Sequence, residues 1–297
     1  MKTDKTPIFK GVGTALVTPF RNGDIDYPAL DKLIEEQIQG GVDALIIGGT
    51  TGEAATLSES EREKLYTYAT ERIDGRVKVV LGTGTNDTRV AKLHTKMAKR
   101  IGCDGALAVT PYYNKGTEEG VFRHYMEIAE SAELPLILYN VPSRTGVNLG
   151  FGLLSRLSEH PRIVGLKEAG DSTDRLVALA AFGDTLPLYA GNDSQIYPVL
   201  ALGGAGVISV ASNLLPREVK GICTDFTAGD TKSALRRQLE LLPLIKALFV
   251  ETNPAPVKYA MELLGLISGE LRLPLATVRD SSARLLELEL SRLGLIR

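Results

Sequence analysis

The chain has 297 residues, of which 44% are hydrophobic and 24% are charged, and its formal net charge is −2. That length allows a large buried core, and a near-balanced charge without basic runs disfavours a nucleic-acid or anionic-membrane surface. The two cysteines, Cys103 and Cys223, are too few and too far apart for a disulfide framework or a cysteine metal site. The start of the chain has no apolar leader, and no stretch is apolar for long enough to cross a bilayer, so we expect a cytoplasmic protein.

Short apolar runs rich in β-branched residues recur along most of the chain and predict buried strands. In chain order they are 12–20, 43–49, 77–84, 105–111, 134–141, 163–167, 186–191 and 206–212. They begin roughly 20 to 35 residues apart, which is the length of one strand and one helix with their turns.

The segments between these runs predict amphipathic helices. Residues 27–41 place leucine and isoleucine on one stripe and end in two glycines, and residues 58–75 open with serine and acids and close on Gly75. Eight strand–helix units predict a (β/α)8 TIM barrel. The alternative, a doubly wound open sheet, normally shows a Gly-x-Gly-x-x-Gly sequence after its first strand, and this chain has none there.

The last part of the chain predicts leucine-rich helices with no further strands between them. No linker rich in glycine, serine or proline separates it from the barrel. We therefore predict a barrel domain over residues 1–230 and a C-terminal helical extension over residues 231–297, packed on the barrel or on another subunit.

Polar residues follow several of the predicted strands, at the end where barrel enzymes carry their chemistry. These candidate residues are Thr50 and Thr51 after the second strand, Tyr112 and Tyr113 after the fourth, Tyr139 and Arg144 after the fifth, Lys167 in the sixth, Gly191 and Asn192 after the seventh, and Ile208 in the eighth. Each has an ordinary structural explanation, since strand-end tyrosines often only pack and Lys167 could pair with Glu168. Their convergence on one face favours a site.

The residue types in this set suit one kind of reaction. A lysine at the end of an apolar strand loses water, so its pKa falls and it can form a Schiff base with a ketone. A tyrosine hydroxyl held by a threonine and a second tyrosine could move the protons. Backbone N–H groups in the "GTTGE" turn, ahead of a helix, suit one carboxylate, and Arg144 suits another. The site therefore predicts a 2-oxo acid and a second acidic carbonyl compound as substrates.

No cofactor or metal ion is expected. No group of histidine and acidic residues has the spacing of metal ligands, which disfavours metal-dependent aldol chemistry. His94, His124 and His160 fall in predicted helices or turns, where we expect them at the surface.

Six motifs in this order resemble the dihydrodipicolinate synthase family, which belongs with N-acetylneuraminate lyase to the pyruvate-dependent class I aldolases. They are "GTTGE", "TPYYNK", "YNVPSRTG", "GLKEA", "GGAGVISV" and "ETNPAPVK". The resemblance runs over nearly the whole chain. It implies condensation of pyruvate with L-aspartate 4-semialdehyde to 4-hydroxy-tetrahydrodipicolinate, an early step towards diaminopimelate and lysine.

The resemblance also implies roles for single residues. Lys167 would form the Schiff base and Tyr139 would transfer protons, with Thr51 and Tyr113 as relay partners. Tyr113 would reach into a neighbouring subunit, which implies a dimer and usually a homotetramer built as a dimer of dimers.

Further residues would hold the substrates. Thr50 and Thr51 would bind the pyruvate carboxylate, Arg144 the carboxylate of the semialdehyde, and Ile208 would offer a main-chain carbonyl beside the lysine. The turn with Gly191 and Asn192 would lie near the second substrate, although many synthases carry an acid in place of Asn192.

The chain departs from lysine-inhibited members of the family at the crevice where they bind free lysine. It keeps Asn86 and Tyr112 but has Glu59, Arg62 and Val90 in place of two histidines and a glutamate. An ammonium group needs acceptors, Val90 offers none and Arg62 would repel it, so we predict weak or absent inhibition by lysine.

Two alternatives stay open at this point. A sister aldolase such as N-acetylneuraminate lyase shares the lysine and tyrosine but takes another aldehyde; the two threonines and Arg144 favour the synthase. A barrel without catalytic activity, kept as a scaffold, is disfavoured because the costly buried lysine and its partners are all present.

Overall fold

The computed structural model describes residues 4–296, and its central element is a closed barrel of eight parallel strands. The strands are β1 (Gly11–Ala15), β4 (Ala44–Ile47), β5 (Lys78–Gly82), β6 (Gly105–Val109), β7 (Leu136–Asn140), β8 (Ile163–Glu168), β9 (Leu188–Ala190) and β10 (Gly206–Ser209). Each pairs with its neighbours in sequence, and β10 closes on β1. The predicted (β/α)8 barrel is confirmed, and every strand lies within or overlaps a predicted run.

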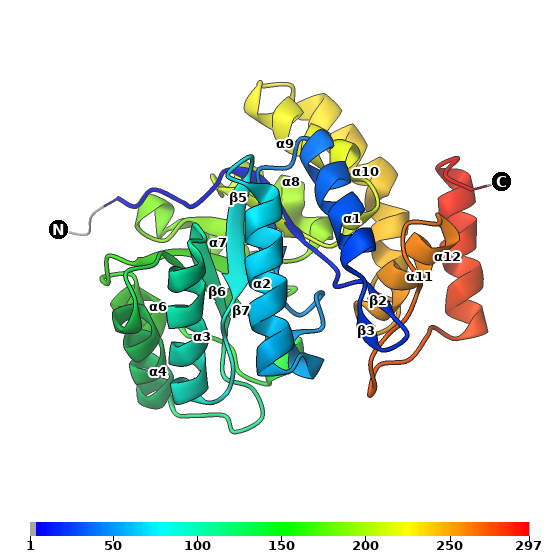
Figure 1. The fold of residues 1–297 in the computed structure, drawn as a ribbon. Helices are drawn as coiled ribbons and strands as arrows, with labels where there is room; N and C mark the ends of the chain where they lie inside the picture. The colour runs from blue at the N-terminus through cyan, green and yellow to red at the C-terminus, as the bar shows by residue number, and fades with distance from the viewer. Residues whose placement is uncertain (1–3, 297) are drawn as a thin grey trace.

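Helices surround the barrel (Figure 1). They are α1 (Tyr27–Gln39), α2 (Glu59–Ile73), α3 (Thr88–Ile101), α4 (Glu118–Ser131), α5 (Pro142–Thr145), α6 (Phe151–Leu157), α7 (Thr173–Ala180), α8 (Ile196–Ala201) and α9 (Pro216–Thr227). Short 3-10 turns are η1 (Ala54–Thr56), η2 (Gly183–Thr185), η3 (Asp193–Gln195) and η4 (Ala211–Asn213). Helix α2 begins as its sequence predicts, because Ser58 and Glu61 form a reciprocal capping box.

The first predicted run is longer than the strand it forms. Strand β1 ends at Ala15, and the chain then forms a small hairpin of β2 (Phe20–Arg21) and β3 (Asp24–Ile25) that the sequence analysis did not predict. Pro19 lies between β1 and β2, and a proline cannot donate a ladder hydrogen bond in a central strand.

Three further helices follow the barrel: α10 (Thr231–Ala247), α11 (Ala255–Leu263) and α12 (Asp280–Arg292). Figure 1 shows them gathered on the side of the barrel away from α4 and α6. The segment 249–253, between α10 and α11, returns to the mouth of the barrel, where it lines a cavity. No helix of the described residues is long and apolar enough to cross a membrane.

Buried side chains form two clusters. The larger lies between the barrel and its helices, and the smaller fills the barrel interior and includes Phe9, Tyr139, Tyr189 and Ile208. Phe9 and Tyr189 pack 4.7 Å apart between ring centres. Tyr139 thus stands on a packed support that fixes its ring.

The surface placement expected for the histidines is wrong for two of them. His94 and His124 are buried. Nε2 of His94 contacts the Glu59 carboxylate at 2.9 Å, and Nδ1 of His124 contacts the Thr88 hydroxyl at 2.9 Å. Polar neighbours on adjacent helices make these positions acceptable for an imidazole.

Candidate active site

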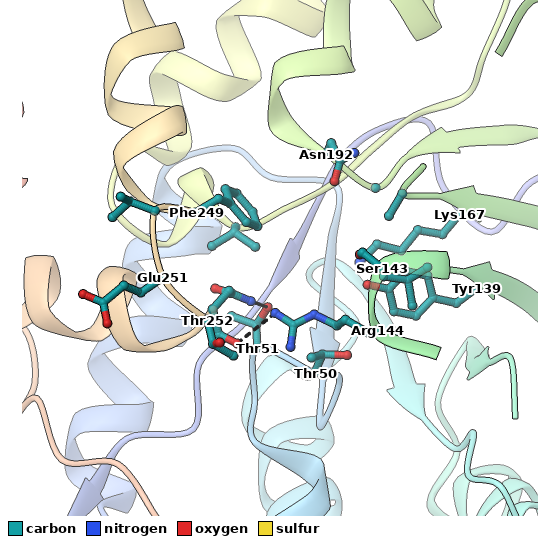
Figure 2. A pocket seen from close by; sticks show the side chains of 16 residues that line it. Thr50, Thr51, Tyr139, Ser143, Arg144, Lys167, Asn192, Phe249, Glu251 and Thr252 are labelled. Carbon is teal, nitrogen blue, oxygen red and sulfur yellow. Dashed lines mark hydrogen bonds between the residues drawn. The ribbon is translucent and has the colours of Figure 1, made fainter. Parts of the chain in front are cut away.

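A cavity of about 450 Å³ opens at the carboxyl ends of the strands (Figure 2). Seven of the ten candidate residues line it: Thr50, Thr51, Tyr139, Arg144, Lys167, Gly191 and Asn192. The remaining wall comes from neighbours of these residues, such as Val141, Ser143, Ala169 and Val210, and from the segment 249–253. The strand order therefore brings together side chains from five strand ends.

Lys167 and Tyr139 stand opposite each other on neighbouring strands. They are direct register partners on β8 and β7, and the lysine Nζ lies 4.2 Å from the centre of the tyrosine ring. Lys167 is only 5% exposed and has no ion-pair partner among the described residues. Burial lowers its pKa to about 7, the Asp193 carboxylate opposes that shift, and the Arg144 guanidinium adds to it. A large share of this amine is neutral near pH 7, and a neutral amine can attack a carbonyl carbon.

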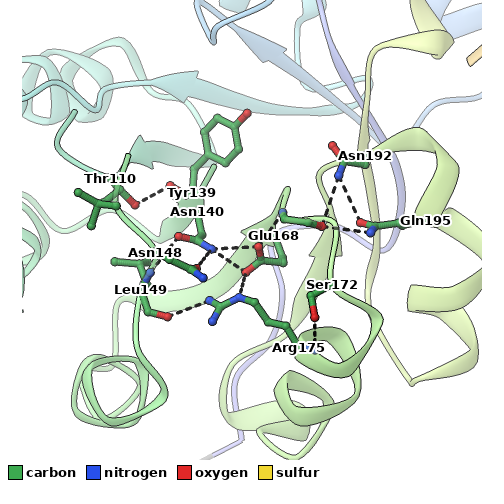
Figure 3. Close-up of polar contacts among 12 residues, drawn as sticks. Thr110, Tyr139, Asn140, Asn148, Leu149, Glu168, Ser172, Arg175, Asn192 and Gln195 are labelled. Carbon is green, nitrogen blue, oxygen red and sulfur yellow. Dashed lines mark hydrogen bonds and ion pairs between the residues drawn. The ribbon is translucent and has the colours of Figure 1, made fainter. Parts of the chain in front are cut away.

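A buried polar network lies directly behind this pair (Figure 3). Asn140 follows Tyr139, Glu168 follows Lys167, and the Asn140 amide donates to both Glu168 oxygens at 2.9 Å. The Arg175 Nε donates to the same carboxylate at 2.9 Å. Because successive side chains point to opposite faces of a strand, this network fixes the register of β7 against β8 from outside the barrel.

The turn after β4 offers hydrogen-bond donors to the cavity. Within residues 4–296, the main-chain N–H groups of Thr50 and Thr51 have no protein acceptor, whereas those of Gly52 and Glu53 are bonded inside the turn. Free N–H groups in a tight turn are suited to a carboxylate. Gly48 precedes them at φ 64°, and a Cβ there would meet the Tyr66 ring at 2.4 Å.

The two threonines lie beside Tyr139 in the cavity wall and differ in their contacts. The Thr51 hydroxyl accepts from the Asn253 amide at 2.9 Å. Burial raises the pKa of the Tyr139 hydroxyl, and the Arg144 charge and the nearby Thr50 side chain oppose that rise.

Arg144 reaches the cavity from the short helix α5. Its Nη2 donates to the main-chain carbonyl of Asn253 at 3.0 Å (Figure 2). This bond occupies one of five guanidinium donors, so a bidentate face stays available for a carboxylate. Arg144 and Lys167 place two positive groups in one cavity, which suits anionic substrates.

Three candidate residues do not line this cavity, and one of them, Tyr112, lines the adjoining cavity described below. Tyr113 is 88% exposed in the loop after β6, at φ 71°. Ile208 is buried in the barrel interior. A single chain therefore does not place Tyr113 beside Tyr139.

Sequence analysis missed two residues of this region. Asp193 is fully buried and follows Asn192 directly, so an acid just beyond a strand end was the available signal. Asn253 lies within the "ETNPAPVK" motif, but only the fold brings it to Thr51. Its amide Oδ1 is buried without a hydrogen-bond partner among the described residues.

A second cavity of about 490 Å³ adjoins the first and shares Thr50, Tyr139 and Arg144 with it. Its wall includes Glu59, Arg62, Val90, His94 and Tyr112. Arg62 donates from Nη2 to the Ala54 carbonyl at 2.7 Å, and Glu59 is held by His94. The second acid in this wall, Glu53, is paired with Lys258, so both acids of the crevice already have partners, and the Arg62 cation faces the same space.

Three comparisons with known proteins agree. The model of the dihydrodipicolinate synthetase family matches residues 8–292. The 4-hydroxy-tetrahydrodipicolinate synthase of Thermotoga neapolitana is 45% identical over 97% of this chain and 100% of its own. The crystal structure of dihydrodipicolinate synthase from Thermotoga maritima superposes with a TM-score of 0.95 at 42% identity, covering 97% and 100% of the two chains. A monomeric dihydrodipicolinate synthase variant gives 0.95 at 42% identity, covering 97% and 98%.

Proposed function

Because the chain belongs to the dihydrodipicolinate synthetase family, as its resemblance predicts, we propose that it condenses pyruvate with L-aspartate 4-semialdehyde through a Schiff base on Lys167. The product is 4-hydroxy-tetrahydrodipicolinate, on the route to diaminopimelate and lysine. The observation that carries the proposal is a buried lysine with a pKa of about 7, facing Tyr139 in a cavity that is also lined by Thr50, Thr51 and Arg144.

The reaction begins at the neutral Lys167 amine. Its lone pair attacks C2 of pyruvate, and loss of water gives a positively charged iminium. The iminium withdraws electrons from C3, which loses a proton and becomes an enamine. The enamine carbon attacks the aldehyde carbon of the second substrate, and the aldehyde oxygen gains a proton. The amino group of that substrate then attacks C2, and the ring closes as Lys167 leaves.

Three groups of this chain support those steps. Tyr139 lies close enough to Lys167 to carry protons to and from the reacting atoms. The Thr50 and Thr51 N–H groups suit the pyruvate carboxylate, and Arg144 suits the carboxylate of the semialdehyde. Residues that hold the two acids apart set the distance over which the new carbon–carbon bond forms.

The assembly belongs to the same proposal. We infer a homotetramer in which the partner subunit places its copy of Tyr113 near Tyr139, and we infer a cytoplasmic location. The 88% exposure of Tyr113 in the single chain supports a role at a contact between subunits. Sedimentation should give a tetramer, and Tyr113→Phe should lower turnover. A fully active monomer would contradict this assignment.

The function is tested by offering the purified protein both kinds of substrate. Pyruvate should be consumed with L-aspartate 4-semialdehyde, and N-acetylneuraminate should not be cleaved. Lys167→Ala is the matched control and should remove the consumption. Cleavage of the sugar acid alone would keep the Schiff base and overturn the assigned aldehyde, while no reaction with either substrate would contradict the enzyme itself.

A further inference from the structure

Asp193 is a buried carboxylate directly behind the cavity residues Asn192 and Val210, and no step above uses it. It opens η3, directly after the cavity residues Gly191 and Asn192, and is 0% exposed. Its Oδ2 accepts from the main-chain N–H groups of Val210 at 2.9 Å and Ala211 at 3.2 Å. Among the described residues it has no cation within ion-pair distance. The carboxylate is therefore fixed in place, but its charge is not neutralised by a direct partner.

The hydrogen bonds around Asp193 favour its charged form. Main-chain N–H groups can only donate, so they stabilise a deprotonated oxygen. The Ser209 hydroxyl also bonds the carboxylate, and the Ser212 N–H donates to that hydroxyl oxygen at 3.0 Å. Ser209 thereby directs its own proton to Asp193. Burial raises the pKa of this carboxyl, and the three oriented donors and the Lys167 amine oppose that rise.

Lys167 is the complementary case on the neighbouring strand. Its amine also lacks a direct charged partner, and the two groups act on each other through space: each shifts the pKa of the other towards its charged form. The other titratable groups that line the cavity are Arg144 on α5, Tyr139 on β7 and Glu251, whose carboxylate accepts from the Arg279 N–H at 3.0 Å. Val210, which donates to Asp193, lines the same cavity as Lys167, so Asp193 is a carboxylate without a cation partner in the described part of the chain, beside two positive groups.

We propose that Asp193 is a positioning residue whose fixed negative charge stabilises the positively charged iminium on Lys167. This inference rests on the proposed Schiff-base chemistry and extends it. Both the amine and its Schiff base can lose a proton, but only the protonated Schiff base, the iminium, is an effective electron sink, so the reaction needs this positive charge. A negative charge near the iminium stabilises this intermediate, because electrostatic interactions are strong in the low dielectric of the barrel. Since the carboxylate does not contact the lysine nitrogen, the amine stays free to attack pyruvate.

The charge is distinguished from the shape by Asp193→Asn, since asparagine fills the same volume and keeps an acceptor for the N–H groups. The measurement is pyruvate bound covalently after borohydride reduction, followed from pH 5.5 to 9 in the full-length protein. We expect the midpoint of the acid limb to move to lower pH, because the lysine loses a neighbouring anion. At a pH above the acid limb, where adduct formation no longer changes with pH, we expect the apparent pyruvate dissociation constant to rise about tenfold, since the iminium is less stable.

Ser209→Ala is the matched control, because it removes one hydrogen bond to Asp193 and leaves the charge. Its acid limb should stay within about 0.3 pH of wild type. Equal midpoints and equal pyruvate affinity in Asp193→Asn and wild type would overturn the proposal. No adduct on wild type at any pH would instead contradict the proposed function, so the two failures are distinguishable.

A wild-type measurement decides the matter if Asp193→Asn does not fold. Protein labelled with ¹³C at aspartate carboxyl carbons is titrated with pyruvate, and Ser209→Ala assigns the Asp193 signal. At pH 9, where the free Lys167 amine is mostly neutral, formation of the iminium adds a positive charge near this carboxyl and should move its ¹³C signal; at pH 5.5 the ammonium already carries that charge, and the movement should be smaller. An Asp193 signal that pyruvate leaves unchanged would overturn the proposal.

Discussion

Two lysines among the described residues are buried, Lys167 on β8 and Lys258 on α11, and they differ in their contacts. Lys258 is fully buried, and its Nζ donates to Glu53 at 2.5 Å and to the Glu270 carbonyl at 2.8 Å. Lys167 has no such partners. Both amines lie over an aromatic ring, at 4.3 Å from the centre of Phe20 and 4.2 Å from that of Tyr139.

The difference shows how one residue type serves two purposes. Burial lowers the pKa of both amines, but the Glu53 carboxylate opposes burial at Lys258 through charge and hydrogen bonding. Its charge joins the turn after β4 to helix α11. At Lys167 the opposing acid, Asp193, is near but not in contact, so the amine can lose its proton and react. Contact with an acid makes a buried lysine structural, and separation from one leaves it reactive.

The largest expected effect tests the ring beside the reactive lysine. Tyr139→Phe gives Lys167 the same kind of ring that Lys258 has, and removes only the hydroxyl. Turnover should fall by about 10² to 10⁴-fold, because the proton carrier is lost. Borohydride should still trap pyruvate on Lys167 after long incubation. Unchanged turnover in a steady-state assay would assign proton transfer to another group.

A nearly equal effect is expected on stability at the structural lysine. Lys258→Met leaves the Glu53 carboxylate buried without its cation, which should lower the free energy of unfolding by about 3–5 kcal/mol. Denaturant titration measures this loss. Adding Glu53→Gln should return part of it, because the uncompensated charge is gone. Independent, additive losses would show that the pair is not coupled.

At the reactive lysine, substitution should change the free energy of unfolding in the opposite direction. Its folded pKa of about 7 lies below the unfolded value of about 10.4, so protonated Lys167 destabilises the fold below pH 7, and that cost is relieved as pH rises towards 10.4. Lys167→Met should therefore raise the free energy of unfolding at pH 6 by about 1–4 kcal/mol. The gain should shrink in the same measurement at pH 9. A gain in stability that does not change with pH would mean that the fold does not lower the pKa of Lys167.

The smallest expected effect concerns free lysine. Its ammonium would need the kind of acceptor that Glu53 gives Lys258, and the second cavity offers Val90, a Glu59 already held by His94, and the cation of Arg62. Turnover should change less than twofold at about 1 mM L-lysine, the range of a weak ligand. A low-micromolar inhibition constant would contradict this interpretation.

Much of this arrangement follows from sequence because parallel strands of a barrel end at one face. Lys167, Tyr139 and the two threonines could be assigned to one site from the position of each at a strand end. The apolar runs that locate these strands are buried on both faces, so their pattern is strong. The first run was misleading only beyond Ala15, where the chain leaves the barrel.

The rest depends on contacts between distant parts of the chain. Asn253 and Thr51 are 202 residues apart, and Lys258 and Glu53 are 205 apart, so no local pattern pairs them. In sequence, Asp193 looks like any acid in a loop, and only the hydrogen-bond donors that β10 and η4 bring to it set it apart. The place of Tyr113 in the site depends on a second subunit.

The central claim is that Lys167, and not Lys258 or a surface lysine, forms the covalent bond with pyruvate. Reduction with borohydride in the presence of pyruvate, followed by peptide mass spectrometry, tests it directly. We predict one reduced pyruvate on the peptide that contains Lys167, and none on Lys167→Ala. An adduct on another lysine, or no pyruvate-dependent adduct on the wild-type protein, would contradict the reactive role assigned to the unpaired lysine.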